Sequence, residues 1–229
     1  MVDEINKVIQ IALAENGYLE KNKKYINNNA VLDSKTDGAG ADNVTKYWRD
    51  IYPAFQQQAW CMCFCVWVMV KAFGIEEAKK RLFTNTFTYS CTQQIKYFRA
   101  KNQFFTTPQV GDLIFYKDSN GNPCHVGLIY KLDSAKIYTI EGNTSSAKGV
   151  VANGGSVNTK SYSKTYSRIY GFGRPGYSAT NVGKTDVEIA LEVLEGKWDN
   201  GAKRRQLLTQ AGYDYITIQN IVNTMLKER

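Results

Sequence analysis

The sequence predicts an α+β domain, in which helices pack on an antiparallel sheet, followed by a small three-helix module. Apolar residues recur at helical spacing through the first part of the chain, whereas short runs rich in β-branched and aromatic residues fill the stretch 112–173. Beyond residue 183 the spacing is helical again. Because helices and strands are segregated along the chain instead of alternating, an α+β architecture is favoured over a parallel α/β sheet.

One helical segment differs from the others. Residues 61–73 are apolar on nearly every face and are followed by Gly74, so we expect a buried helix at the centre of the domain. A long loop rich in Asn, Asp, Ser and Gly is expected over 27–43. The other helices of this part are expected over 3–14, with Asp3 as N-cap, and over 45–51, 75–82 and 90–101.

Turn residues separate the predicted strands, as expected for an antiparallel sheet. The strands are expected over 112–117, 124–130, 136–141, 149–152 and 168–173. Three further helices are expected over 185–195, 202–210 and 217–226. These elements predict a domain over 1–176, a linker over 177–183 and a helical module over 184–229.

Composition and charge bound the function. The chain has 229 residues, 43% hydrophobic and 22% charged, which excludes a disordered or collagen-like protein, and its longest apolar run, 59–70, is too short to span a bilayer. The net charge of +8 lies wholly in residues 1–177, which hold 22 basic and 14 acidic residues. A basic surface attracts polyanions such as nucleic acid, anionic lipid or an acidic cell wall, although the basic residues are scattered apart from the cluster at 21–24. No nucleic-acid partner and no membrane insertion are expected. Attraction to an anionic cell wall and a general solubilising charge both remain open.

The sequence contains a single histidine, His125. An enzyme that needs an imidazole base at neutral pH must therefore use His125. A hairpin centred on Asp133 would pair position 125 with position 141 and place Asn143 on the same face as Glu141. A carboxylate and an amide would then stand beside the imidazole, and either can hold its second nitrogen.

Cys61 is the candidate nucleophile, because it begins the buried helix. The positive end of the helix dipole lowers the pKa of a thiol there and favours the thiolate. For any one cysteine a buried apolar role is the alternative, as expected for Cys63 and Cys65, and a lone histidine is more often structural. Cysteine, histidine and acid in this order are typical of papain-like folds, however, and the combination favours catalysis.

Several motifs carry a resemblance to CHAP amidohydrolase/peptidase domains, over roughly residues 5–176. Gln58-Ala59-Trp60-Cys61 resembles their nucleophile motif, and Cys124-His125-Val126-Gly127 resembles their histidine strand. The segments 108–115, 140–144 and 171–175 resemble the start of their sheet, their Glu/Asn strand and their closing strand. Phage and prophage endolysins are the most similar members.

This resemblance implies roles for individual residues. Cys61 is expected to be the nucleophile, His125 the base, Glu141 the group that orients it, and Asn143 a supporting polar residue. The oxyanion hole and cleft are expected to involve Gln57 or Gln58, together with Trp60. Substrate specificity is expected in the loops 27–43, 84–90 and 144–165.

The tail resembles the type-7 cell-wall-binding repeat over residues 183–226, which implies a muropeptide ligand. Side chains suited to hold a sugar-peptide by stacking and charge-assisted hydrogen bonds are Trp198, Arg204, Tyr213 and Tyr215. The alternative is that Trp198 and Tyr213 form the small core of the module. A single copy implies weak binding or avidity through self-association.

No cofactor and no metal are expected. Asp33, Asp37 and Asp42 suggest a calcium loop, but they lack the alternate acidic spacing and the distal Glu of an EF-hand. The five cysteines form no paired framework and no zinc pattern, so reduced thiols are expected.

The function predicted is hydrolysis of peptidoglycan by a phage or prophage endolysin that cleaves an amide bond of the wall peptide. The chain begins without a signal-peptide pattern, so we expect synthesis in a bacterial cytoplasm and access to the wall through a holin-type pore or from outside. Two alternatives stay open: a cysteine protease that acts on protein, and a non-catalytic wall-binding protein. Amidase and endopeptidase specificity are not distinguished by the sequence.

Overall fold

The computed structural model describes residues 4–177, 186–211 and 213–227, which belong to two compact units. The larger unit comprises residues 8–176, and the smaller one contains the helices that follow residue 177. The predicted N-cap Asp3 and most of the predicted linker 177–183 lie outside the described residues.

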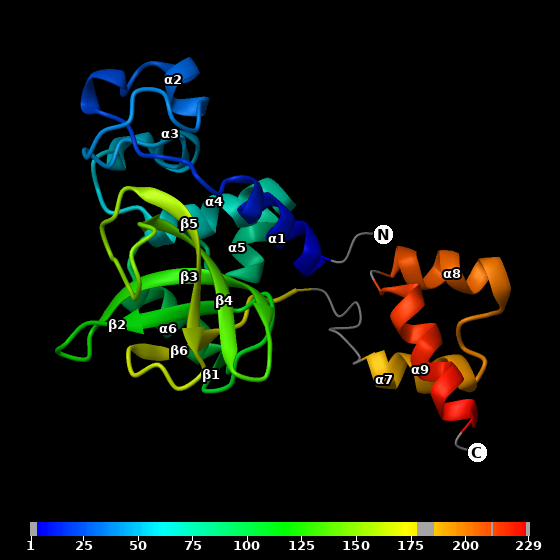
Figure 1. Cartoon of the computed structure of the whole chain (residues 1–229). Coiled ribbons are helices and arrows are strands. Elements are labelled where there is room, and N and C mark those ends of the chain that lie inside the picture. Colours follow the sequence, from blue (N-terminus) through cyan, green and yellow to red (C-terminus); the bar gives the residue numbers. More distant parts are fainter. Residues whose placement is uncertain (1–3, 178–185, 212, 228–229) are drawn as a thin grey trace. The chain divides into compact units, whose positions relative to one another are not determined.

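The larger unit is built on a six-stranded antiparallel sheet, in the order β1-β6-β2-β3-β4-β5 (Figure 1). Its strands are β1 (Phe104–Phe105), β2 (Leu113–Lys117), β3 (Pro123–Leu132), β4 (Lys136–Thr144), β5 (Ser156–Ser163) and β6 (Ile169–Gly173). Strands β2, β3, β4 and β6 confirm predicted strands to within a few residues. The short edge strand β1 has no counterpart in the prediction.

The buried helix predicted over residues 61–73 is confirmed as α4 (Cys61–Phe73), and ten of its thirteen residues are buried. It contacts β3 and β4, while α6 (Cys91–Ala100) contacts β3. Gly74 ends α4 with a φ of 78°, a conformation that favours glycine. The remaining helices of this unit are the part of α1 (Glu4–Ala14) from Val8 onward, α2 (Asn29–Asp33), α3 (Lys46–Ile51) and α5 (Ile75–Arg81), with 3-10 turns at Lys23–Tyr25 and Pro53–Phe55. The α+β prediction is therefore confirmed.

The strand predicted over residues 149–152 is wrong. That stretch is irregular, and Gly149 adopts a φ of 78°. The strand is β5 instead, in which Val157 and Tyr162 are buried among polar residues. Because β5 lies at the edge of the sheet, it tolerates Ser, Thr, Asn and Lys, and its sequence lacks the apolar run that marks a central strand.

The loop predicted over residues 27–43 is also not wholly irregular. It contains α2, whose N-cap Asn28 accepts a hydrogen bond from the backbone N–H of Val31. Capping by a short polar side chain satisfies one orphan N–H group and permits a single helical turn in a polar segment. Leu32 is the one buried residue of this helix.

The predicted pairing of residue 125 with residue 141 is wrong by two positions. Leu128 pairs with Ile140, so the register moves Glu141 towards Gly127. After Ile129 the pairing shifts by one residue, because Tyr130 is an extra residue in β3. Without this bulge, the tight turn at Asp133 would place Glu141 on the other face of the sheet from His125.

A buried ion pair ties the last strand of the sheet to the start of β2. Arg174 Nε donates to Asp112 Oδ1 at 2.9 Å, and a second guanidinium nitrogen donates to Oδ2 at 3.0 Å. The backbone N–H of Gln109 also donates to Asp112, whose exposure is only 1%. Arg174 stacks over Phe105, so this residue closes the end of the sheet.

The smaller unit consists of α7 (Asp186–Leu194), α8 (Gly201–Gln210) and α9 (Tyr215–Lys227). Its core contains aliphatic residues from all three helices: Ile189, Ala190, Val193, Leu208, Ile218 and Val222. Trp198, Tyr213 and Tyr215 pack against this core. The three predicted tail helices are confirmed by the structure, although Thr185 lies outside the described residues.

Replacement of Arg174 with Ala is expected to lower the free energy of unfolding by about 3 kcal/mol, because it leaves the Asp112 carboxylate buried without its partner. Chemical denaturation checks this value. Lys80→Ala, which removes an exposed ion pair with Glu77, serves as the control and is expected to cost less than about 0.5 kcal/mol. Equal effects of the two substitutions would contradict the structural role of Arg174.

Candidate active site

Three predicted site residues come from three different elements. Cys61 is the first residue of α4, His125 lies in β3 and Glu141 lies in β4. Their exposures are 6%, 0% and 0%, so all three are buried. Since α4 contacts both strands, the fold brings together residues that are far apart in the sequence.

Glu141 holds the imidazole directly. Its Oε2 lies 3.0 Å from Nε2 of His125. Gly127 leaves the space for this contact, because a Cβ atom at Gly127 would lie 2.5 Å from Cγ of Glu141. The observed register therefore keeps the predicted contact between Glu141 and His125, although the residue opposite Glu141 on β3 is Gly127 and not His125.

Three hydroxyl groups complete the surroundings of the Glu141 carboxylate. Tyr116 donates to Oε1 at 2.8 Å, Thr139 donates to Oε1 at 2.6 Å, and Tyr162 donates to Oε2 at 3.3 Å. Burial alone would raise the pKa of Glu141, but His125 and the donated hydrogen bonds lower it below its usual range. Glu141 is therefore ionised although it is fully buried.

Cys61 and His125 shift each other's pKa in opposite directions. Burial lowers the pKa of His125, but the neighbouring Cys61 sulfur and Glu141 outweigh burial and raise it to about 9. The Nδ1 atom makes no hydrogen bond of standard geometry with any described residue. With Nε2 engaged by Glu141, Nδ1 is the ring nitrogen left for exchange of a proton with the thiol.

The pKa of Cys61 lies well below its usual value. The neighbouring Cys91 thiol lowers it most, burial opposes this, and His125 and the backbone N–H of Met62 lower it further. An imidazolium beside a thiolate is the arrangement that thiol hydrolases use for nucleophilic attack. Cys63 and Cys65, deeper in α4, have raised pKa values because they are buried, which agrees with an inert packing role.

Cys91 belongs to this site, although it was not among the predicted site residues. It begins α6 after the N-cap Ser90, just as Cys61 begins α4. Its pKa is raised, first by the neighbouring Cys61 and then by burial, so it stays a neutral thiol beside the Cys61 sulfur. Its place at the start of a predicted helix was the available signal, but Cys91 lies 30 positions beyond Cys61 in the sequence, and no local pattern indicates their contact.

Asn143 lies in β4, two residues beyond Glu141, with a φ of 55°. It is fully buried, and neither atom of its side-chain amide has a hydrogen-bond partner among the described residues. Its backbone carbonyl accepts a hydrogen bond from Gly154. The amide thus makes no bond with the imidazole, and its supporting role remains a prediction.

The three predicted cleft residues lie in different settings. Gln58 lines a pocket, and Gln57 is exposed with a φ of 72°. Trp60 has no exposed surface; its indole stacks on Tyr47 and donates to Glu20 at 2.9 Å. The indole of Trp60 therefore does not line a cleft and instead supports the start of α4 from within the core.

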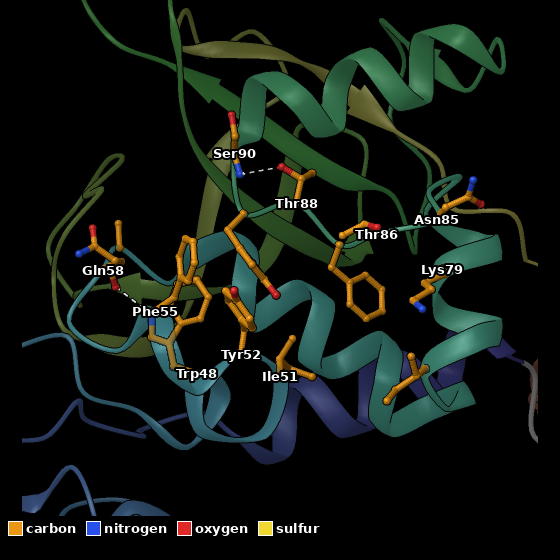
Figure 2. A pocket seen from close by; sticks show the side chains of 14 residues that line it. Trp48, Ile51, Tyr52, Phe55, Gln58, Lys79, Asn85, Thr86, Thr88 and Ser90 are labelled. Atoms are coloured by element: carbon orange, nitrogen blue, oxygen red, sulfur yellow. Dashed lines mark hydrogen bonds between the residues drawn. The ribbon is translucent and has the colours of Figure 1, made fainter.

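The pocket lined by Gln58 has a volume of about 780 Å³ (Figure 2). Nε1 of Trp48 donates to the backbone carbonyl of Gln58, which joins the pocket wall to the segment that leads into Cys61. The pocket is formed by Trp48, Ile51, Tyr52, Phe55, Gln58, Ala59, Ile75, Lys79, Asn85, Thr86, Phe87, Thr88, Tyr89 and Ser90. Part of the predicted specificity loop 84–90 therefore lines it.

The predicted wall-binding residues of the smaller unit make contacts inside the module. Trp198 and Tyr213 meet edge to face at 5.8 Å, which favours the core role considered from the sequence. Arg204 donates to the carbonyl of Asp199, to Asn200 and to Gln219. Tyr215 lies beneath the guanidinium of Arg205. A ligand would have to compete with these contacts.

Two further features concern metals and membranes. Among the described residues, no group of three His, Cys, Asp or Glu side chains is placed to hold a metal ion. Within the same part of the chain, none of the helices has the length and apolar character that a membrane crossing needs.

Comparisons with protein families agree with this architecture. The CHAP domain family matches residues 53–143, and the CW_7 repeat family matches residues 187–226. The CHAP family comprises cysteine- and histidine-dependent amidohydrolases or peptidases, and residues 53–143 are similar to it. The chain thus carries a CHAP domain match that is followed by a C-terminal CW_7 repeat match.

Two other comparisons, with curated proteins and with solved structures, add little to the family matches. A search of curated proteins finds no match. The crystal structure of Ly7917 is similar at a TM-score of 0.43 and 12% identity, over 75% of this chain and 62% of that one. The chain thus spans somewhat under two thirds of the length of that structure.

Glu141→Gln is expected to lower the pKa of His125 from about 9, because it removes the carboxylate charge that stabilises the imidazolium. The alkaline limb of the pH–activity profile should move to lower pH by the same amount, and the rate should fall about a hundredfold or more. Titration of the imidazole by NMR checks the shift, since the single histidine gives one set of ring signals. An unchanged titration would contradict the proposed contact.

Cys91→Ala is expected to raise the pKa of Cys61, because the strongest pKa-lowering contact is lost. The acid limb of activity should move to higher pH, and alkylation of Cys61 by iodoacetamide at neutral pH should slow. Peptide-resolved mass spectrometry separates Cys61 from the other four thiols. Cys91→Ser retains a hydroxyl donor and should restore part of the reactivity; equal effects of Ala and Ser would argue for packing alone.

Proposed function

We propose that this chain is a peptidoglycan hydrolase of the endolysin type, of phage or prophage origin, that cleaves an amide bond of the wall peptide through Cys61, His125 and Glu141. The observation that carries the proposal is the 3.0 Å contact between His125, the sole histidine, and the buried carboxylate of Glu141. His125 also lowers the pKa of Cys61, and Cys61 raises the pKa of His125.

The chemistry follows from these contacts. The Cys61 thiolate attacks the amide carbonyl and forms a tetrahedral intermediate. The imidazolium of His125 gives its proton to the leaving amine, and a thioester to Cys61 remains. Neutral His125 then takes a proton from water, and the resulting hydroxide attacks the thioester. This step releases the carboxylic acid and regenerates the Cys61 thiolate beside the His125 imidazolium. Glu141 keeps the ring oriented and stabilises its charged form.

The rest of the chain supports delivery to a wall. The excess of basic residues in residues 1–177 favours attraction to anionic wall polymers of a Gram-positive cell. The CW_7 repeat would raise the local concentration of the enzyme at peptidoglycan, and one copy per chain fits weak binding strengthened by self-association. We propose synthesis in a host bacterial cytoplasm and release through a holin-type pore.

The bond that is cleaved distinguishes two possible wall activities. N-acetylmuramoyl-L-alanine amidase and endopeptidase activity use the same thiol chemistry, and the three residues named above fit both. A protease acting on protein is disfavoured by the wall-binding repeat. Mass spectrometry of released fragments separates the two wall activities. An amidase detaches the whole peptide from the sugar chain and frees the amino group of its first residue, whereas an endopeptidase frees an amino group within the peptide and leaves a peptide stub on the sugar.

Cys61→Ala is expected to abolish lysis of purified Gram-positive walls, and Cys61→Ser to reduce the rate by at least a thousandfold, because a serine hydroxyl is not ionised by His125. The decrease in turbidity measures the rate. Cys124→Ala, which changes a half-buried thiol next to the histidine in sequence, is the matched control and should lyse walls at nearly the wild-type rate.

Two outcomes would count against the proposal. Undiminished lysis by both Cys61 variants would remove the thiol mechanism. Absence of lysis by the wild type on walls of several chemotypes would favour a non-catalytic wall-binding protein.

A further inference from the structure

The pocket beside the candidate nucleophile has an aromatic wall, which consists of Trp48, Tyr52, Phe55 and Tyr89. Trp48 and Tyr89 meet edge to face at 4.6 Å, and Tyr52 and Phe55 lie 4.7 Å apart. Trp48 also lies 5.7 Å from Phe55. These contacts join the four rings into one surface, three of whose members come from the α3 region and one from the loop before α6.

Part of this aromatic wall is open to solvent. The exposures of Tyr52 and Phe55 are 45% and 40%, whereas Trp48 is fully buried behind them. Large exposed rings that are grouped in a concave surface are typical of a binding site, because their burial against a ligand is favourable. Figure 2 shows Tyr52 and Phe55 beside Trp48 on one wall of the pocket.

The loop before α6 adds a polar set of lining residues, which consists of Asn85, Thr86, Thr88 and Ser90 and is interrupted by Phe87 and Tyr89. Thr88 Oγ1 accepts the backbone N–H of Ser90, and Ser90 Oγ accepts that of Gln93, so these two residues shape the loop (Figure 2). The side-chain amide of Asn85 and the hydroxyl of Thr86 make no hydrogen bond with the described residues. They are therefore available to a ligand.

The pocket offers little charge to a ligand. Lys79 is its only charged lining residue, and Nζ already forms an ion pair with Glu76 at 2.9 Å. A wall peptide carries carboxylates, which would find no free cation here. An N-acetylated sugar is neutral, and it presents an apolar C–H face together with hydroxyl and acetamide groups. This combination matches a pocket that is lined by both exposed aromatic rings and polar side chains.

The position of the pocket connects it to the reaction. Gln58 and Ala59 line it and lead directly to Cys61, and Ser90 lines it immediately before Cys91. Both thiols of the site thus follow segments that line the pocket: Cys61 lies two residues beyond Ala59, and Cys91 lies one residue beyond Ser90.

We propose that this pocket binds an N-acetylated sugar ring of the glycan strand, with the ring stacked on Tyr52 and Phe55 and its polar groups on Asn85 and Thr86. The inference rests on the proposed function and assigns the glycan part of the substrate to a specific surface. Binding of the sugar holds the attached peptide at Cys61, so binding energy remote from the scissile bond contributes to the rate.

The test compares the full-length wild type with the double variant Tyr52→Ala/Phe55→Ala. On purified walls, the variant should show a KM about tenfold higher, with a smaller change in kcat, because two stacking contacts are lost. The oligosaccharide tetra-N-acetylchitotetraose should inhibit the wild type competitively and inhibit the variant at least tenfold more weakly. The CW_7 repeat is identical in both proteins, so sugar binding by the repeat cancels in this comparison.

Two controls separate stacking from general damage. Tyr97→Ala changes a partly buried tyrosine of α6 outside the pocket and should leave KM and inhibition unchanged. Tyr52→Phe/Phe55→Tyr keeps both rings and should retain the wild-type KM. Circular dichroism of each variant confirms folding, which the exposed positions of both rings favour.

The possible failures are distinguishable. If the wild type lyses walls and depends on Cys61, but the double variant keeps the wild-type KM and the same inhibition by the oligosaccharide, the sugar site alone is wrong. Inhibition through this pocket by a sugar-free wall peptide instead of the oligosaccharide would likewise overturn it. If the wild type fails to lyse walls of any chemotype, the proposed function and this inference both fall.

Discussion

The contact between a buried carboxylate and the only imidazole is the constraint on which this domain depends. An isolated ionised Glu141 would be very costly in the interior, because burial removes its hydration. The structure supplies three hydroxyl donors and the Nε2 atom of His125, which together lower the pKa of the carboxyl instead of letting it become neutral. The same contact offsets the effect of burial on the imidazole and keeps it charged beside Cys61. The stability of the domain and the proposed reaction thus both depend on the charged pair of Glu141 and His125. Gly127 leaves the space for this pair, because it has no side chain to clash with Glu141.

This constraint also explains why the hairpin between β3 and β4 has an irregular register. The turn near Asp133 alone would put Glu141 on the wrong face, and the bulge at Tyr130 restores the alternation. The sequence was sufficient to predict which strands pair, since each is a short apolar run between turn residues. It was not sufficient to predict the register, because a bulge depends on packing that no local pattern records. The polar edge strand β5 was missed for a related reason: an edge position relaxes the demand for apolar residues from which strands are predicted.

The candidate site shows the same division between local and non-local information. Cys61 was predictable because helix start, apolar content and residue type coincide in one segment, and His125 because it has no competitor in the chain. The contribution of Cys91 was not predictable, since it depends on two helix starts meeting in space. Trp60 was assigned to a cleft from its position next to the nucleophile, yet its indole points into the core and donates to Glu20. Adjacency in sequence therefore located the site but did not say which side chains face a substrate.

The short segment from Gln58 to Cys61 links recognition with reactivity. Its first residues line the aromatic pocket, its carbonyl at Gln58 is held by the indole of Trp48, and its last residue begins α4. The backbone that would contact a bound ligand is thus the backbone that orients the thiol towards His125. The start of α4 can serve both binding and reactivity. Its free backbone N–H groups stabilise a thiolate, and the buried remainder of α4 holds its first turn in place. A ligand in the pocket would therefore contact residues two and three positions before Cys61, and the hydrogen bond from Trp48 to the Gln58 carbonyl holds this short segment in place.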